Sequence, residues 1–203
     1  IPLRLVGSEM CIRDSCILKN FELRLLTSLF FKIYMKNIIK TLLLILATIS
    51  TSAFSEEIAD KNRFLRSGLD VEELPGHSYI IINEDIRDNI KKILKDTYHL
   101  PIIKYWKAGN KVGFVLEAIG KHEFITTGYI VENNKIIDAK VLVYRENYGY
   151  EIEHDYFLDQ IRGNSVKKNG KLVKSIANIS GATLSVKAMR KLSKLSLYLY
   201  TII

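Results

Sequence analysis

The chain has 203 residues, with 30 Lys or Arg against 22 Asp or Glu, so its net charge is +8 at neutral pH. Hydrophobic residues make up 48% of it. Basic side chains are interspersed with acidic ones, and no nucleic-acid-binding module accompanies them. We therefore expect no nucleic-acid partner.

The beginning of the chain carries no usable structural pattern. Residues 6–15 resemble a translated adapter sequence and not part of a domain. We therefore interpret residues 1–34 as non-native upstream translation and exclude them from fold reasoning.

Residues 35–55 have the layout of a secretory signal peptide. Lys36 and Lys40 give a positive start, an uncharged apolar run follows, and Ala53 and Ser55 suit positions −3 and −1 of a cleavage site. The alternative is an uncleaved anchor, but the apolar core is short and contains Lys40, whereas about 20 apolar residues are needed to span a bilayer. We expect export to a periplasmic or other extracytoplasmic compartment.

Cleavage after residue 55 would leave a chain without cysteine, since Cys11 and Cys16 both precede that point. Such a chain can form no disulfide and no thiolate metal site, and it has no cysteine nucleophile. Its 23 basic and 19 acidic side chains give a net charge of +4. The chain has four histidines, His77, His99, His122 and His154. None has a second possible metal ligand at i+2 or i+4, so we expect no metal site.

Residues 56–203 are numerous enough for one domain with a buried core. The charged segment 56–70 lacks clean periodicity, so we expect residues 56–76 to form an extended N-terminal segment. The folded domain would then cover residues 77–203.

A short strand and a helix should open this domain. Residues 79–82 are apolar and have strand character. Asn83 can cap a helix that begins at Glu84, where acidic side chains suit the positive end of the helix dipole. Apolar residues at helical spacing continue to Tyr98, so the helix is expected to end only at Pro101.

Strand patterns dominate the next part of the chain. Two pairs of β-branched or aromatic segments each flank an Asn- or Gly-containing turn: 102–107 with 112–119, and 124–131 with 136–144. Such pairs predict hairpins in an antiparallel sheet. A short helix is expected at 155–161 and a further strand at 172–176. The predicted fold class is α+β, a single domain whose antiparallel sheet is built from hairpins and flanked by helices.

The segment most informative about function is Ser180-Gly181-Ala182-Thr183, which opens onto an apolar-periodic helix at 184–199. Gly181 and Ala182 lack bulky side chains and would let a ligand approach the backbone. Thr183 would lie where the first free N–H groups of the helix point, a position that favours phosphate. The alternative is an ordinary Ser or Thr N-cap on the last helix.

Residues from about 105 to 198 resemble the FMN-binding domain family, which includes an FMN-carrying component of the sodium-translocating NADH:quinone reductase. The resemblance rests on the motif at 180–183 and on the segments 128–144, 145–151 and 157–163. In that family a Ser/Thr-Gly-Ala-Thr motif holds FMN through a phosphoester to its last threonine. The resemblance implies FMN as the cofactor and Thr183 as its attachment residue.

The resemblance also implies a set of cofactor-binding residues around the start of the last helix: Ser180, Gly181, Ala182, Thr183, Leu184 and Ser185. Backbone N–H groups of the first turn would hold the remaining phosphate oxygens, and the two serines could add hydroxyl donors. Four aromatic residues are candidates to stack on the flavin ring, the alternative being ordinary packing in the sheet: Trp106, Tyr144, Tyr148 and Tyr150.

The function implied is that of an exported FMN-binding electron-transfer protein serving a membrane-associated redox chain. Its partners would be a flavin transferase using FAD and a membrane redox complex or quinone-linked electron donor or acceptor. No catalytic residue is expected, because the flavin itself carries the electrons.

Two other functions stay open. Relatives usually carry Asp three residues before the motif serine, at a position associated with recognition by the transferase, and this chain has Ala177 there. That difference keeps a flavin-free extracytoplasmic binding module as an alternative. The third hypothesis is a reductase that turns over a small substrate on the flavin.

Overall fold

The computed structural model describes residues 31–32, 34–42 and 56–203. Residues 31–32 and 34–42 are helical and exposed, and they belong to a separate unit from residues 55–203. The expected cleavage site and most of the expected upstream segment 1–34 lie outside the described residues. Within the described part of the chain, no helix has both the length and the apolar composition needed to cross a bilayer.

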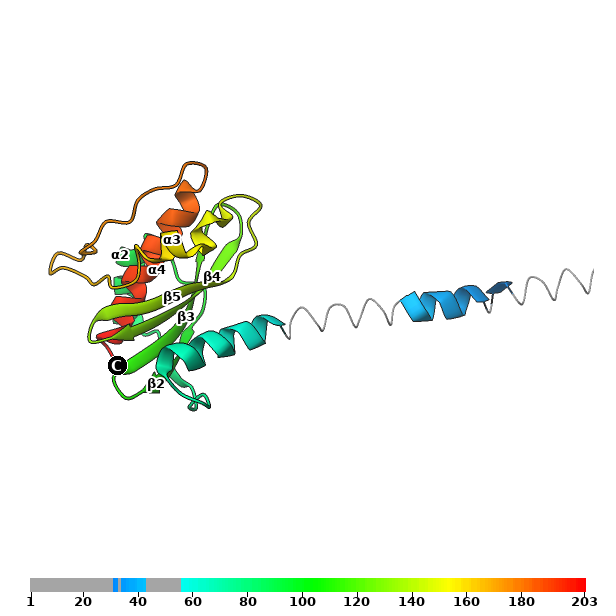
Figure 1. Ribbon diagram of the computed structural model, residues 1–203, viewed down its shortest axis with the longest axis horizontal. Coiled ribbons are helices and arrows are strands. Elements are labelled where there is room, and N and C mark those ends of the chain that lie inside the picture. The colour runs from blue at the N-terminus through cyan, green and yellow to red at the C-terminus, as the bar shows by residue number, and fades with distance from the viewer. Residues whose placement is uncertain (1–30, 33, 43–55) are drawn as a thin grey trace, which may run out of the picture. The chain divides into compact units, whose positions relative to one another are not determined.

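Five strands form one antiparallel sheet in which each strand pairs with the next one along the chain (Figure 1). They are β1 (Ser78–Ile81), β2 (Ile102–Ala108), β3 (Lys111–Ile119), β4 (Phe124–Glu132) and β5 (Lys135–Val143). The helices from residue 84 onward are α2 (Glu84–Leu94), the short 3-10 helix η1 (Tyr150–Glu153), α3 (Asp155–Leu158) and α4 (Thr183–Tyr200). The predicted single α+β domain, with flanking helices on a hairpin-built sheet, is confirmed.

Both predicted hairpins are present. Gly109-Asn110 connects β2 to β3, and Asn133-Asn134 connects β4 to β5. Both asparagines of the second turn have positive φ, +49° and +58°, which a type I′ turn requires and asparagine tolerates better than most residues. The helix expected at 155–161 is present as α3, which ends at Leu158.

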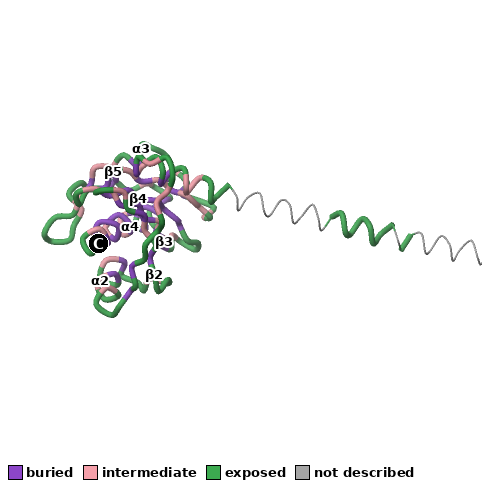
Figure 2. Tube along the Cα trace, turned by 90° about the horizontal axis from the view of Figure 1, so that it is seen from below, coloured by how far each residue is buried: buried purple, intermediate pink, exposed green. Residues whose placement is uncertain are grey.

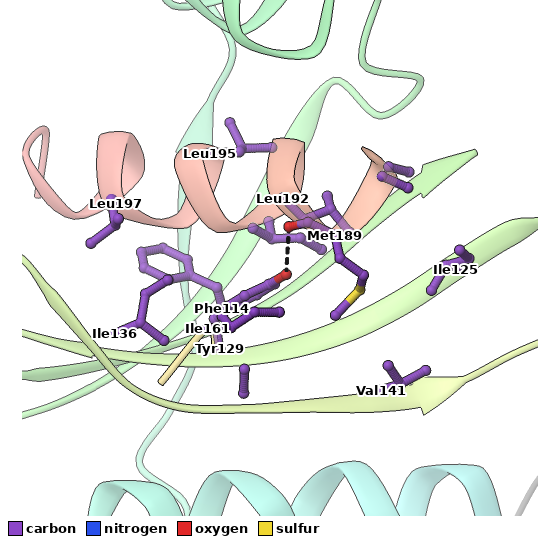
Figure 3. Close-up of a cluster of buried hydrophobic side chains, with 14 of the residues drawn as sticks. Phe114, Ile125, Tyr129, Ile136, Val141, Ile161, Met189, Leu192, Leu195 and Leu197 are labelled. Carbon is purple, nitrogen blue, oxygen red and sulfur yellow. Dashed lines mark hydrogen bonds between the residues drawn. The ribbon is translucent and has the colours of Figure 1, made fainter. Parts of the chain in front are cut away.

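Residues 56–69 form a helix, so the expectation of an extended segment there was wrong. This N-terminal helix buries Phe64, Leu65 and Leu69 in a cluster with Trp106 and Ile130. It lies on the face of the sheet opposite α4, as the close-up shows (Figure 3). The three buried residues lie at helical spacing, but the charged residues around them obscured the pattern.

Glycines allow the N-terminal helix to lie close to the sheet. A Cβ at Gly128 of β4 would come within 2.4 Å of Phe64, and one at Gly113 of β3 within 2.7 Å of Leu65. At Gly128 the atoms in the way belong to the Phe64 ring, whereas at Gly113 the nearest atom is the end of the flexible Leu65 side chain, so the requirement for glycine is stronger in β4.

We expect Gly128→Ala to lower the free energy of unfolding by about 1–3 kcal/mol, because the new methyl group must displace Phe64. Urea denaturation of the variant measures the change. Gly76→Ala is the matched control, since nothing lies within 4 Å of a Cβ at Gly76. Equal stabilities of the two variants would contradict close packing of the N-terminal helix on β4.

The long helix α4 covers the other face of the sheet (Figure 3). Its side chains Met189 and Leu192 are fully buried in one cluster with Phe114 and Tyr129 of the sheet. The Tyr129 hydroxyl donates to the carbonyl oxygen of Met189 at 3.4 Å. Because helices cover both faces, β4 is buried without interruption from residue 125 to residue 131 (Figure 2).

Helix α2 begins where expected but ends earlier. The Asn83 side chain accepts a backbone N–H of the first turn at 2.9 Å. The helix stops at Leu94 because Lys95 adopts a left-handed conformation. Tyr98 therefore lies outside the helix, and its hydroxyl accepts the N–H of Glu117 on β3 at 3.4 Å. Packing against the sheet overrode the helical pattern at this residue.

Stability at alkaline pH should depend on Tyr98. Burial raises the pKa of Tyr98 to about 12, although the hydrogen bond from the Glu117 backbone lowers it. The unfolded chain loses this proton near pH 10, so the contribution of Tyr98 is complete below that pH and is lost as the pH rises to about 12. Over that interval the free energy of unfolding should fall by roughly 1–3 kcal/mol more in the wild type than in Tyr98→Phe. Urea unfolding of both proteins measures this, and parallel pH profiles would contradict it.

The strand expected at 172–176 is absent from the described chain, where this segment makes one isolated bridge, between Val166 and Leu172. The buried side chain of Asn164 replaces a strand partner. Its amide donates to the carbonyl of Lys174 at 3.0 Å, and its oxygen accepts the N–H of the same residue at 3.1 Å. The Asn164 side chain thus makes the two hydrogen bonds that a neighbouring strand would otherwise make with the backbone of Lys174.

Candidate functional site

The segment Ser180-Gly181-Ala182-Thr183 forms the entry to α4. Gly181 has φ +84°, a left-handed conformation that favours glycine, and a Cβ there would meet nothing within 4 Å. Ala182 is the N-cap residue, and no side chain caps the helix. The alternative of an ordinary Ser or Thr N-cap is therefore wrong.

Thr183 is the first residue of α4. The N–H groups of Thr183, Leu184 and Ser185 have no carbonyl four residues earlier within the helix. Val186 is the first to make such a bond, to the Ala182 carbonyl at 2.9 Å. Uncapped N–H groups and the positive end of the helix dipole together favour an anion at this position.

A cavity of about 630 Å³ opens at this end of α4. Three parts of the chain line it: the turn between β3 and β4, the segment after β5, and the entry to α4. The lining residues are Lys121, His122, Glu146, Asn147, Tyr148, Gly149, Tyr150, Glu151, Gly181, Ala182, Thr183, Leu184 and Ser185. The volume lies within the range of small-molecule and cofactor sites.

The Thr183 hydroxyl is available at the cavity wall. Thr183 is exposed, and its Oγ1 accepts a hydrogen bond from Nδ2 of Asn178 at 3.0 Å. This bond uses a lone pair and leaves the hydroxyl proton free. Asn178 was not among the residues predicted from sequence.

The Ser185 hydroxyl donates its proton to Tyr144, so this proton is not available to a ligand. The Tyr144 hydroxyl donates its single proton to the carbonyl of Tyr148 at 2.5 Å. Ser185 must therefore donate in its 3.0 Å bond to Tyr144. Burial raises the pKa of the Tyr144 hydroxyl, the Ser185 bond opposes this, and neighbouring carboxylates add to it. Ser185 offers a bound anion its backbone N–H.

Gly149 makes this arrangement possible. Its φ is +93°, and a Cβ would lie 2.8 Å from the Tyr144 hydroxyl and 3.1 Å from Oγ of Ser185. The segment after β5 can therefore approach the first turn of α4 only with glycine at this position.

Five of the six predicted cofactor-binding residues line the cavity, and Ser180 does not, being exposed outside the lining. Tyr148 and Tyr150 also line it, with exposed fractions of 80% and 58%. Tyr144 does not line the cavity and is the hydrogen-bond partner of Ser185. Trp106 packs in the cluster under the N-terminal helix and does not line the cavity, so for this residue the structure shows the alternative, ordinary packing.

Sequence reasoning missed the part of the cavity formed by the turn between β3 and β4. Lys121 and His122 come from this turn. Gly120 is consistent with a turn at this point, but no local sequence pattern indicates that this turn lies near the start of α4. Among the described residues, no group of three His, Cys, Asp or Glu side chains is placed to hold a metal ion.

Residues 120–197 match the model of the FMN-binding domain family. This part of the chain is an FMN-binding domain. Every residue that lines the cavity lies inside the matched segment. No curated protein was found to match the chain.

FMN is the cofactor of this domain, and the residues at the cavity fit it. The uncapped start of α4 suits its phosphate, and Gly181 leaves the approach open. Tyr148 and Tyr150 provide aromatic surface at the wall. Oε2 of Glu151 is shielded from solvent and has no hydrogen-bond partner among the described residues, so this wall also holds an unsatisfied acceptor.

Proposed function

We propose that the chain is an exported FMN-carrying electron-transfer protein of a membrane-associated redox chain, with FMN held by a phosphoester to Thr183. The observation that carries the proposal is the position of the Thr183 hydroxyl. It belongs to the first residue of an uncapped helix and lies at the wall of the cavity in the FMN-binding domain. Export follows from the signal-like segment 35–55 and is part of the proposal.

The covalent step would use FAD as co-reactant on a flavin transferase. Oγ1 of Thr183 forms a bond to the phosphorus of the FMN half, the pyrophosphate bond breaks, AMP leaves, and the hydroxyl proton is released. The bond from Asn178 holds Oγ1 in place without consuming that proton. The first-turn N–H groups stabilise the charge on the phosphate oxygens.

Electron transfer is favoured over substrate turnover by the character of the cavity wall. FMN supplies the redox chemistry when bound. Tyr148 and Tyr150 are largely exposed, so a redox partner can come close to a flavin held here. We assign no catalytic role to any residue of the chain, and a membrane redox complex or quinone-linked protein is the proposed partner.

Equilibrium titration of the chain with FMN and with riboflavin tests the site. Riboflavin lacks the phosphate, so it should bind roughly 5- to 30-fold more weakly if the start of α4 supplies about 1–2 kcal/mol to the anion. Equal affinities would contradict the phosphate position. No binding of FMN at all would instead support the flavin-free binding module, which Ala177 keeps as the second candidate.

N-terminal sequencing of protein recovered from an extracytoplasmic fraction tests export. Cleavage after Ser55 places Glu56 at the new N-terminus. We expect that terminus because small residues occupy positions −3 and −1. Recovery of the protein only with cytoplasmic markers would contradict the proposal.

A further inference from the structure

The turn between β3 and β4 is organised around a carboxylate from another part of the chain. Oε1 of Glu146 accepts the backbone N–H groups of Lys121, His122 and Glu123, the last two at 2.6 and 3.0 Å. The Gly120 N–H closes the turn on the Glu123 carbonyl at 2.9 Å. One oxygen thus satisfies three successive donors.

This carboxylate connects two walls of the cavity. Glu146 lies in the segment after β5, while its three donors lie 23 to 25 residues earlier in the sequence. Gly120 keeps the space that the carboxylate occupies, because a Cβ there would lie 2.8 Å from Oε1. Both sides of this contact contribute residues to the cavity lining.

We propose that Glu146 is a positioning residue that fixes Lys121 and His122 at the rim of the FMN cavity. The inference rests on this cavity being the FMN site. Without the carboxylate, three adjacent N–H groups would lose their acceptor and the turn would relax toward water. Lys121 would then cease to add positive potential to a site that receives a phosphate anion.

The ionisation of Glu146 agrees with this role. Burial acts to raise the pKa of the Glu146 carboxyl group. The three backbone hydrogen bonds and the nearby His122 lower it, and the net effect is a lowered pKa. The carboxylate therefore stays charged at neutral and mildly acidic pH. Charge on the acceptor strengthens each of the three bonds.

The test compares Glu146→Ala, Glu146→Gln and Glu123→Ala in the full chain, with FMN as the probe. Glu146→Ala should weaken FMN binding about tenfold, since backbone donors lose a charged acceptor. It should also speed hydrogen exchange at the amides of residues 121–123. Glu146→Gln should recover part of both effects, because its amide oxygen can still accept. Glu123→Ala removes an exposed neighbouring carboxylate and should leave FMN binding unchanged.

Three results would overturn the proposal. These are wild-type FMN affinity in Glu146→Ala, an equal loss in Glu123→Ala, and a Glu146→Gln variant as weak as the alanine variant. Thermal denaturation of each variant in the absence of FMN separates a loss of folding from a loss of binding. If the wild-type chain binds no FMN, the proposed function fails, and that result is distinct from an unchanged affinity in Glu146→Ala.

Discussion

Thr183→Ala is expected to abolish covalent flavin attachment completely. Of the hydroxyls in the motif, the one on Thr183 lies at the first helical residue and at the cavity wall. Alanine keeps the helix start but has no oxygen to esterify. When the variant is produced with a flavin transferase and FAD, the denatured protein should be colourless, and its intact mass should lack the addition of one FMN less water.

Ser180→Ala is the matched control for this prediction. Ser180 belongs to the same motif but lies outside the cavity lining. The Ser180 variant should stay yellow after denaturation and carry the full additional mass. A flavinylated Thr183→Ala protein, or a colourless Ser180→Ala protein that is folded, would contradict the assignment of the attachment residue.

The second large effect is expected at Gly149. Gly149→Ala places a methyl group within 2.8 Å of the Tyr144 hydroxyl while the backbone has φ +93°. The left-handed conformation costs about 1–2 kcal/mol for a residue with a Cβ, and overpacking adds about 1–3 kcal/mol. The segment after β5 should move away from α4, so the free energy of unfolding and the affinity for FMN should both fall.

Gly170→Ala separates the two causes. Gly170 also has positive φ, +74°, but nothing lies within 4 Å of a Cβ there. Chemical denaturation and FMN titration of both variants give the comparison. Gly170→Ala should lose only the conformational part of the stability and keep wild-type FMN affinity. If Gly149→Ala behaves in the same way, the close contact with Tyr144 and Ser185 has no role in the site.

Local sequence patterns predicted the hairpins and the start of α4. Turn chemistry at Asn133-Asn134 needs left-handed residues, and the structure has them there. The small residues of the motif left two interpretations open, a phosphate site and an ordinary Ser or Thr N-cap, and Ala182 as N-cap excludes the second. These features depend on a few adjacent residues, so the sequence alone displays them.

Features that depend on distant residues could not be predicted in this way. Helix formation at 56–69 draws on burial of Phe64 against Gly128, about 60 residues later. In the segment 172–176, the side chain of Asn164 takes both backbone hydrogen bonds of Lys174 in place of a neighbouring strand. The contact of Glu146 with residues 121–123 likewise has no local signature. Tertiary contacts decided all three cases.

Backbone amide shifts during an FMN titration test the central claim most directly. If the phosphate binds at the start of α4, the amides of Thr183, Leu184 and Ser185 should show the largest changes in a ¹⁵N-labelled chain. A second cavity, lined by residues that include Ile93 and Leu197, serves as the internal control. Largest shifts at that second cavity, with the first turn of α4 unchanged, would contradict the account.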